Sequence, residues 1–245
     1  KSMKDLFSEH SRLYQQARPT YPQALIEELL VHVPSYERAW DCGAGSGQLT
    51  PLLAPYFQEI IATDISQNQL DQAPRFANVN YLQQSAEQTD FPAQTFDLIT
   101  VAQAIHWFDF DKFYAEVKRT LKPTGIFAAI GYGLLNVDDV DLNNRIGHIY
   151  TQTLDGFWDA ERRYVDEHYQ TIPFPFQEIS MLSFKIELTW TGQQLWDYLN
   201  TWSAVKHYQK QHNMSPLEGI KDILLMQAMT VSFPILLRVG EIPTA

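Results

Sequence analysis

Residues 39–47, Ala-Trp-Asp-Cys-Gly-Ala-Gly-Ser-Gly, join a short apolar run to an acidic residue and three alternating glycines. Each glycine removes a Cβ where the chain turns from a strand into a helix, so the backbone can lie against a bulky ligand. We therefore expect residues 39–47 to form a cofactor-binding strand end. The spacing of the glycines then distinguishes between classes of ligand.

Three common glycine motifs do not fit this spacing. A dinucleotide-binding turn reads G-x-G-x-x-G, and counting from Gly43 places Gln48 where the third glycine should be. A phosphate-binding P-loop needs Gly-Lys-Ser/Thr, which is absent from this segment. The esterase motif G-x-S-x-G fails because Ala44 and Gln48 stand at its glycine positions around Ser46. The pattern that remains is D-x-G-x-G-x-G.

The chain from 36 to 132 alternates apolar runs with amphipathic stretches, which predicts β-α-β units and a parallel sheet. The predicted strands cover residues 37–42, 59–63, 79–83, 96–102 and 125–131, and the predicted helices cover 48–56, 67–73 and 109–121. A turn over Pro123-Thr124-Gly125 separates the last helix from the last strand. This stretch is expected to be the core of the domain.

The pattern changes after residue 133. Residues 138–169 are polar, charged and aromatic with helical spacing, so residues 134–176 are expected to form a helical cap. Strands predicted at 179–190 and 231–239 would complete the sheet as an antiparallel edge, with helices at 192–211 and 216–229 between them. The fold class is α/β: a Rossmann-like, seven-stranded, mostly parallel sheet with helices on both faces and a cap insertion. A single domain would cover 1–245, with its core at about 22–133 and 177–245 and an N-terminal lid helix at 1–21.

Composition limits the partners. The 245 residues carry a formal net charge of −11, which opposes binding to phosphate backbones, so nucleic acid is not an expected partner. No apolar stretch reaches membrane-spanning length, and the first residues lack a secretory signal, so we expect a soluble cytoplasmic protein with no membrane partner. Cys42 is the only cysteine, which leaves no disulfide and no cysteine cluster for a metal, so no bound metal is expected. Oligomeric state cannot be read from the sequence.

Asp64 follows the second predicted strand, about twenty residues after the glycine segment. An acid at this place can accept hydrogen bonds from both hydroxyls of a ribose. The alternative is that Asp64 caps the helix that begins near Gln67, a position that Ser66 could also fill.

The run D-x-G-x-G-x-G resembles the first motif of class I S-adenosylmethionine-dependent methyltransferases. Residues 102–108, Ala-Gln-Ala-Ile-His-Trp-Phe, narrow this resemblance to the type 11 methyltransferase domain and to the small-molecule enzymes grouped with trans-aconitate methyltransferase. Residues 119–127 resemble the family's R-x-L-K-P-G-G turn, with Thr124 in place of the first glycine. Residues 7–22 resemble its entry segment, with Ser11 in place of alanine, and residues 202–208 resemble its W-S-A/S-V-x-x-Y stretch.

The resemblance implies S-adenosylmethionine as the cofactor and a set of residues around it. The glycine segment would pass beneath the methionine part, Asp64 and Ile65 would hold the ribose, and the residues after the third strand would hold the adenine. Tyr14 and Arg18 share one helix face and could contact the methionine end, although Arg18 could equally pair with a surface acid. The expected cofactor residues are Tyr14, Arg18, Asp41, Gly43, Ala44, Gly45, Gly47, Asp64, Ile65, Ser85, Ala86, Glu87, Gln103 and Ala104.

The acceptor is less well defined. His106 is the candidate general base, with His207 behind it, although a histidine that only packs in the core fits this position equally well. Trp107, Tyr132 and Trp202 are candidate pocket residues together with His207. A carboxylic acid acceptor would need a nearby cation, for which Arg18, Arg145, Arg162, Arg163 and Lys206 are available.

We expect a methyltransferase that acts on a small molecule, such as a carboxylic acid or a hydroxyl compound. The alternatives are a protein that binds S-adenosylmethionine without turnover, as a sensor or a partner surface, and a nucleotide-dependent oxidoreductase. Gln48 at the third-glycine position opposes the oxidoreductase.

Overall fold

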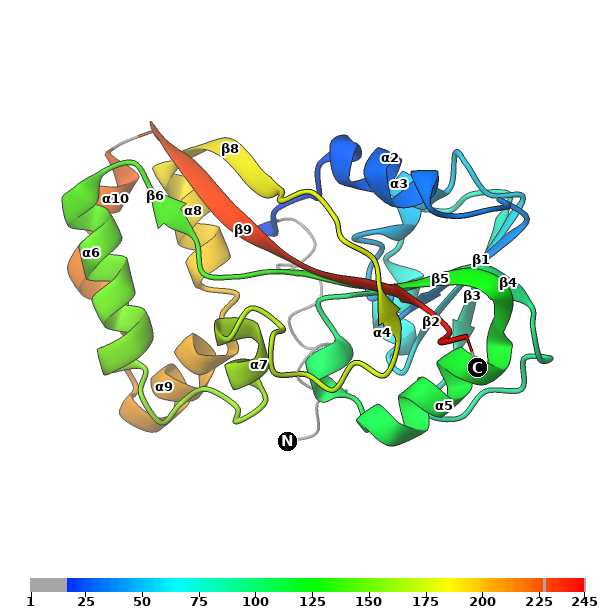
Figure 1. The fold of residues 1–245 in the computed structure, drawn as a ribbon. Helices are drawn as coiled ribbons and strands as arrows, with labels where there is room; N and C mark the ends of the chain where they lie inside the picture. The colour runs from blue at the N-terminus through cyan, green and yellow to red at the C-terminus, as the bar shows by residue number, and fades with distance from the viewer. Residues whose placement is uncertain (1–16, 227, 245) are drawn as a thin grey trace.

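The computed structural model describes residues 17–226 and 228–244 (Figure 1). Five parallel strands form the centre of one sheet in the order β3-β2-β1-β4-β5. They are β1 (Arg38–Cys42), β2 (Glu59–Asp64), β3 (Val79–Gln83), β4 (Phe96–Ala102) and β5 (Leu121–Tyr132). The α/β class and the mostly parallel sheet predicted from the sequence are confirmed.

Within the described part of the chain the sheet has nine strands, where the sequence predicted seven. The long strand β9 (Ala228–Glu241) runs antiparallel to β5 and also pairs with β6 (Asn136–Val137), β7 (Gln177–Glu178) and β8 (Lys185–Thr191). The two additional strands, β6 and β7, have two residues each, which is too short for any alternating pattern in the sequence.

Helices cover both faces of the parallel strands (Figure 1). They are α2 (Gln23–Val31), α3 (Thr50–Leu53), α4 (Gln67–Asp71) and α5 (Phe110–Thr120). Neighbouring residues of β4 face opposite sides: Leu98 packs in the cluster that contains Leu25 of α2, and Ile99 packs in the cluster that contains Phe113 of α5. Every residue of β4 is buried, as expected for a parallel strand with both faces covered.

The start of β5 differs from the expected turn at 123–125. Phe96 pairs with Leu121, the register then shifts, and Leu98 pairs with Ile126. Pro123, Thr124 and Gly125 therefore lie within a bulge of the strand instead of ending a helix.

A second lobe of helices stands beside the sheet. It contains α6 (Val140–His148), a π-helical turn over Ile149–Thr153, α7 (Arg162–Asp166), α8 (Gly192–Leu199), α9 (Ser203–His212) and α10 (Lys221–Leu225). Two separate stretches of the chain thus build this lobe, where the sequence placed only 134–176 in a cap. Rings from both stretches are in contact, with Tyr150 5.3 Å from Trp202 and Phe157 5.1 Å from Tyr208.

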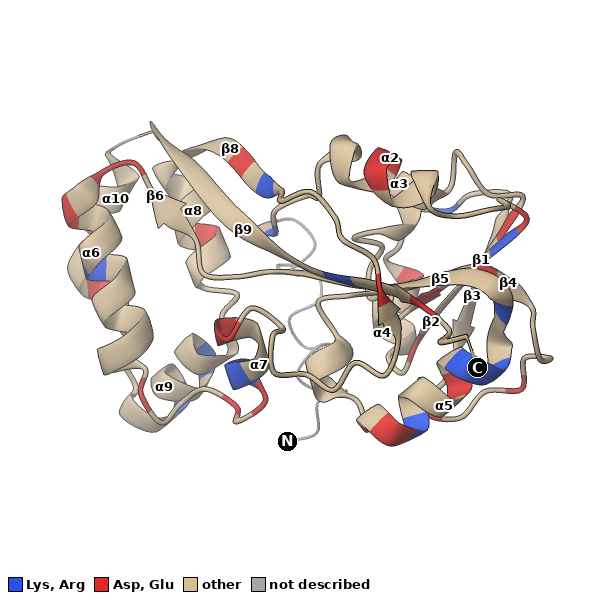
Figure 2. Ribbon diagram, in the orientation of Figure 1, with Lys and Arg blue, Asp and Glu red and all other residues tan. Residues whose placement is uncertain are grey.

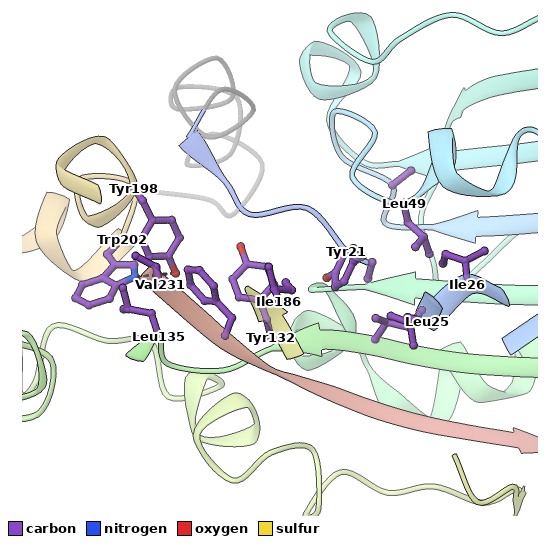
Figure 3. Close-up of a cluster of buried hydrophobic side chains, with 14 of the residues drawn as sticks. Tyr21, Leu25, Ile26, Leu49, Tyr132, Leu135, Ile186, Tyr198, Trp202 and Val231 are labelled. Atoms are coloured by element: carbon purple, nitrogen blue, oxygen red, sulfur yellow. Dashed lines mark hydrogen bonds between the residues drawn. The ribbon is translucent and has the colours of Figure 1, made fainter. Parts of the chain in front are cut away.

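Strand β9 links the two lobes. Its first half pairs with β8 and β6 beside the helical lobe, and its second half pairs with β5 in the main sheet. Figure 3 shows the hydrophobic cluster that continues across this junction, from Leu25 and Ile26 through Tyr132 to Tyr198 and Trp202.

Charged residues lie mainly on the outer helices and loops, and lysines and arginines alternate with acids over both lobes (Figure 2). Within the described residues, no helix has both the length and the apolar composition needed to cross a membrane.

Candidate functional site

The three glycines after β1 form a tight loop. Gly43, Gly45 and Gly47 have φ values of +64°, +59° and +90°, a region that residues with a Cβ rarely adopt. A Cβ added to Gly43 would lie only 2.9 Å from the Cβ of Ala104, which follows β4. The loop therefore approaches the end of β4 so closely that only glycine fits at position 43.

Asp41 lies beneath this loop and is fully buried. Its carboxylate accepts hydrogen bonds from Thr50 Oγ1 at 2.6 Å and from Thr100 Oγ1 at 3.0 Å. Burial raises the pKa of Asp41 to about 6, since the charged form loses its hydration. The Asp41 side chain therefore ties the loop to α3 and β4.

Asp64 lies at the end of β2 and faces the loop. Its Oδ2 accepts a hydrogen bond from the backbone N–H of Gly45 at 3.0 Å, and its Oδ1 accepts one from the N–H of Ser66 at 2.9 Å. Ser66, and not Asp64, caps α4 by accepting from the N–H of Gln69. Burial raises the pKa of Asp64, although the hydrogen bonds from these N–H groups oppose that shift.

Gln103 shapes the end of β4. Its backbone is left-handed, with φ of +56°, and its N–H donates to the carbonyl of Ile130 at 2.8 Å. The side-chain amide accepts from the N–H of Tyr132 at 2.8 Å and donates to the carbonyl of Tyr132 at 3.3 Å. A strained backbone held by this many bonds is typical of a functional site.

Two hollows open along this carboxyl edge of the sheet, where ligands of open α/β folds bind. They share Gly43, Asp64 and Ala104. One is lined further by Ile65, Gln84, Ala86, Glu87, Trp107 and Phe108, and the other by Gly45, Ser46, Gln48, Gln69, Ala102 and Gln103.

A third cavity, of about 90 Å³, lies between the sheet edge and the helical lobe. It is lined by Gln103, His106, Trp107, Tyr132, Trp158, Arg162, Tyr198, Thr201, Trp202 and Ser203. Trp107 also lines the first hollow and Gln103 the second, so the three spaces lie next to one another. Most of the walls are aromatic, which suits an apolar or planar molecule.

His106 is buried in a 3-10 turn over Ile105–Trp107, with only 5% of its surface exposed. Among the described residues, neither of its ring nitrogens has a hydrogen-bond partner. Burial lowers its pKa to about 3, and the nearby charge of Arg162 acts in the same direction. The imidazole is therefore neutral at physiological pH and is a weak base.

The remaining expected residues have different positions. Arg18 donates from Nη1 to Ser46 Oγ at 3.0 Å, so it contacts the glycine loop. Ser85 and Glu87 are joined by a 2.7 Å hydrogen bond and line a shallow depression beside the first hollow. Ala44, Gly47 and His207 do not line the three spaces, and His207 lies on α9. Tyr14 and residues 1–16 of the lid predicted at 1–21 are outside the described residues.

Several lining residues lie outside the motifs of the sequence. Tyr198 and Thr201 come from the end of α8 and the turn before α9, a stretch that the sequence assigned to the core of the sheet domain. Gln69 and Gln84 also line the hollows, and glutamine is common in helices and turns. Only the W-S-A-V stretch at 202–205 pointed to this part of the cavity. Among residues 17–226 and 228–244, no group of His, Cys, Asp or Glu side chains could hold a metal ion.

The chain is similar to methyltransferases in sequence. A model of the methyltransferase domain matches residues 40–129. A Dictyostelium discoideum protein named as a methyltransferase is 35% identical over 225 residues, which are 90% of this chain and 85% of that protein. A Saccharomyces cerevisiae protein named as an S-adenosylmethionine-dependent methyltransferase is 29% identical over 124 residues, 47% of this chain and 43% of its own.

Solved structures extend the similarity to the whole fold. A protein from Anaeromyxobacter dehalogenans, described as a type II methyltransferase, has a TM-score of 0.85 and 37% identity, covering 93% of this chain and 99% of that one. A Haemonchus contortus phosphoethanolamine N-methyltransferase, in complex with phosphomonomethylethanolamine and S-adenosylhomocysteine, has a TM-score of 0.51. It covers 100% of this chain and 61% of its own, and at 16% identity it shows the shared fold alone.

Proposed function

Because this chain belongs to the class I S-adenosylmethionine-dependent methyltransferases with a type 11 methyltransferase domain, we propose that it methylates a small molecule that carries a carboxylic acid or a hydroxyl. The observation that carries this proposal is the position of the aromatic cavity beside the two hollows. Gln103 and Trp107 each line both a cofactor-side hollow and the aromatic cavity. An acceptor in that cavity would therefore lie beside the cofactor. A cavity of about 90 Å³ suits a small metabolite better than a nucleic acid.

The residues along the sheet edge fit S-adenosylmethionine. At Gly43, where a Cβ would not fit, the loop exposes only backbone to both hollows. Asp64 lines both hollows as well. In this proposal Asp64 and Ile65 hold the ribose, Ala86, Glu87 and Phe108 border the adenine, and Gly45, Gln103 and Ala104 border the methionine part. The bound cofactor supplies an electrophilic methyl group on a sulfonium.

The protein's own contribution is to position the acceptor and exclude water. Trp107, Trp158 and Trp202 give the cavity ring faces that can pack on an apolar acceptor. A carboxylate acceptor is already ionised at neutral pH and needs no base, whereas a hydroxyl must lose its proton. Since the pKa of His106 is about 3, this residue is a poor base for a hydroxyl, which favours the carboxylic acid.

Calorimetry and an acceptor screen together test this proposal. We expect S-adenosylhomocysteine to bind, and we expect product from at least one small acid or hydroxyl compound in the presence of S-adenosylmethionine. Asp64→Asn should weaken binding about tenfold or more, because an amide cannot accept from Gly45, Ser66 and two ribose hydroxyls together.

Asp71→Asn is the matched control, since Asp71 is an exposed residue of the neighbouring helix α4. Tight binding without product across acids, phenols and alcohols would support a binding protein without turnover. No binding at millimolar ligand would contradict the assigned cofactor site.

The proposal includes the cytoplasm as the compartment. Its support is the single cysteine, which is buried as a free thiol, together with a cofactor of intracellular metabolism.

A further inference from the structure

We propose that Arg162 selects the acceptor by binding a carboxylate of that molecule with its two Nη groups. This inference rests on the methyltransferase function proposed above and adds the residue that recognises the acceptor. The charges that face the aromatic cavity support it. Arg162 is the one charged side chain among the described residues that line it, and no carboxylate lines it. This cation is notable in a chain with a formal net charge of −11.

The guanidinium of Arg162 is held in place from one side. Its Nε donates to the hydroxyl of Tyr150 at 3.0 Å and lies 4.0 Å from Oδ1 of Asp166. The Tyr150 hydroxyl in turn donates to Oδ1 of Asp166. The Cζ of Arg162 lies 5.0 Å from the centre of the Trp158 ring and 5.7 Å from the centre of the Tyr150 ring. The side chain is thus fixed by its Nε edge and by two rings.

The two Nη groups remain available. Within the described residues, neither Nη1 nor Nη2 of Arg162 donates a hydrogen bond, although the side chain of Arg162 is only 20% exposed. Two parallel N–H groups of a guanidinium match the two oxygens of a carboxylate. Tyr150 and Asp166 are therefore positioning residues, and the Nη edge is the binding edge.

The rest of the lining indicates a carboxylate and not a phosphate. A phosphate dianion would need further cations or several backbone N–H groups, and the described lining has a single cation. Close by, burial lowers the pKa of His106, so the imidazole is uncharged and adds no second positive charge. Tyr132, Tyr198 and Trp202 supply the apolar walls for the body of the molecule. The site therefore fits a molecule with a planar or apolar body and one carboxylate that faces Arg162.

The test compares two ligands of nearly equal shape. Benzoate and benzamide would be titrated into the full chain saturated with S-adenosylhomocysteine, with binding followed by calorimetry and tryptophan fluorescence. We expect the wild-type protein to bind benzoate about 10- to 100-fold more tightly than benzamide, as for a charge-assisted hydrogen-bonded pair. In Arg162→Met the preference should fall below about threefold. Arg162→Lys should keep part of it, because a lysine keeps the charge but loses the planar pair of donors.

Arg163→Met is the matched control, because it removes the same charge from the next residue. Arg163 is exposed, donates to the hydroxyl of Tyr164, and does not line the cavity. This variant should keep the wild-type preference for benzoate. All variants should bind S-adenosylhomocysteine as the wild-type protein does, which separates a loss of fold or cofactor site from a loss of acceptor recognition.

Equal binding of benzoate and benzamide to the wild-type protein would overturn the inference. An unchanged preference in Arg162→Met would also overturn it, since another group would then bind the acid. Neither result would affect methyl transfer itself, which the acceptor screen with S-adenosylmethionine measures separately. If Arg162→Met does not fold, the wild-type comparison and Arg162→Lys still decide the question.

Discussion

At the scale of single residues, burial determines the chemistry of His106. The ring is 5% exposed, has no hydrogen-bond partner among the described residues, and has a pKa near 3. In the unfolded chain the same group has a pKa of 6.5. As the pH falls below about 6.5, the unfolded chain therefore takes up the proton before the folded one does, and the free energy of unfolding decreases until the pH reaches about 3.

We predict a pH-dependent stability difference between the wild-type protein and His106→Gln. Lowering the pH from 7 to 5 should reduce the free energy of unfolding of the wild-type protein by about 2 kcal/mol more than that of the variant, because the pKa of His106 differs between the folded and the unfolded chain. Urea unfolding at the two pH values measures this. Asp41, whose pKa is raised to about 6, contributes with the opposite sign in both proteins and cancels in the comparison. Equal pH slopes would show that His106 is not held neutral by burial.

The residues that the sequence could identify are those fixed by local geometry. Gly43, Gly45 and Asp64 were predictable because a sharp turn after a strand and an acid after the next strand leave a fixed spacing. Arg162 was only one of five candidate cations. Its contacts with Tyr150, Asp166 and Trp158 are properties of the packed structure, and so is the absence of another charged side chain among the described residues that line the cavity.

At the scale of secondary-structure elements, the same substitution should have opposite effects in a loop and in a helix. Gly43→Ala places a Cβ 2.9 Å from the Cβ of Ala104 at a φ of +64°, so we predict weaker binding of S-adenosylhomocysteine by at least tenfold and lower stability. Gly147→Ala adds a methyl group within α6, where no atom lies within 4 Å, and should stabilise the protein by about 0.5–1 kcal/mol. Calorimetry and thermal unfolding of both variants provide the measurement, and a cofactor affinity that Gly43→Ala leaves unchanged would contradict the role of the loop.

Strands and helices with a periodic apolar pattern were predictable from the sequence, whereas the elements that they pack against were not. Strands β1 to β4 begin and end within one residue of the predicted ranges, because alternating apolar runs and turn residues mark them locally. Helices α8 and α9 lie within the one helical stretch predicted at 192–211, but their place beside the segment that follows α6 depends on contacts such as Trp158 with Trp202, 44 positions apart in the chain. Sequence periodicity carries no information on such long-range packing.

At the scale of the whole molecule, β9 and the cluster beside it couple the two lobes. Phe233 of β9 is fully buried, and its ring lies 5.3 Å from Tyr132, 5.9 Å from Trp190 and 5.2 Å from Tyr198. Tyr132 and Tyr198 also line the aromatic cavity. The aromatic cavity therefore exists only while both lobes are folded and joined, so its integrity reports on both lobes.

Cys42 offers a direct measure of this global stability, because it is the only cysteine and is 1% exposed at the end of β1. Strand β1 lies between β2 and β4 in the centre of the sheet, and burial raises the pKa of the thiol. A thiol reagent can therefore react only after the sheet opens, and we predict that the native protein is labelled far more slowly than the urea-unfolded chain. S-adenosylhomocysteine at 100 times its Kd should slow labelling by about another hundredfold, because it binds only the closed form. At the same ligand concentration the protection should fall to about tenfold or less in Asp64→Asn and should stay near a hundredfold in Asp71→Asn. Native labelling as fast as that of the unfolded chain would show that the centre of the sheet is open without global unfolding.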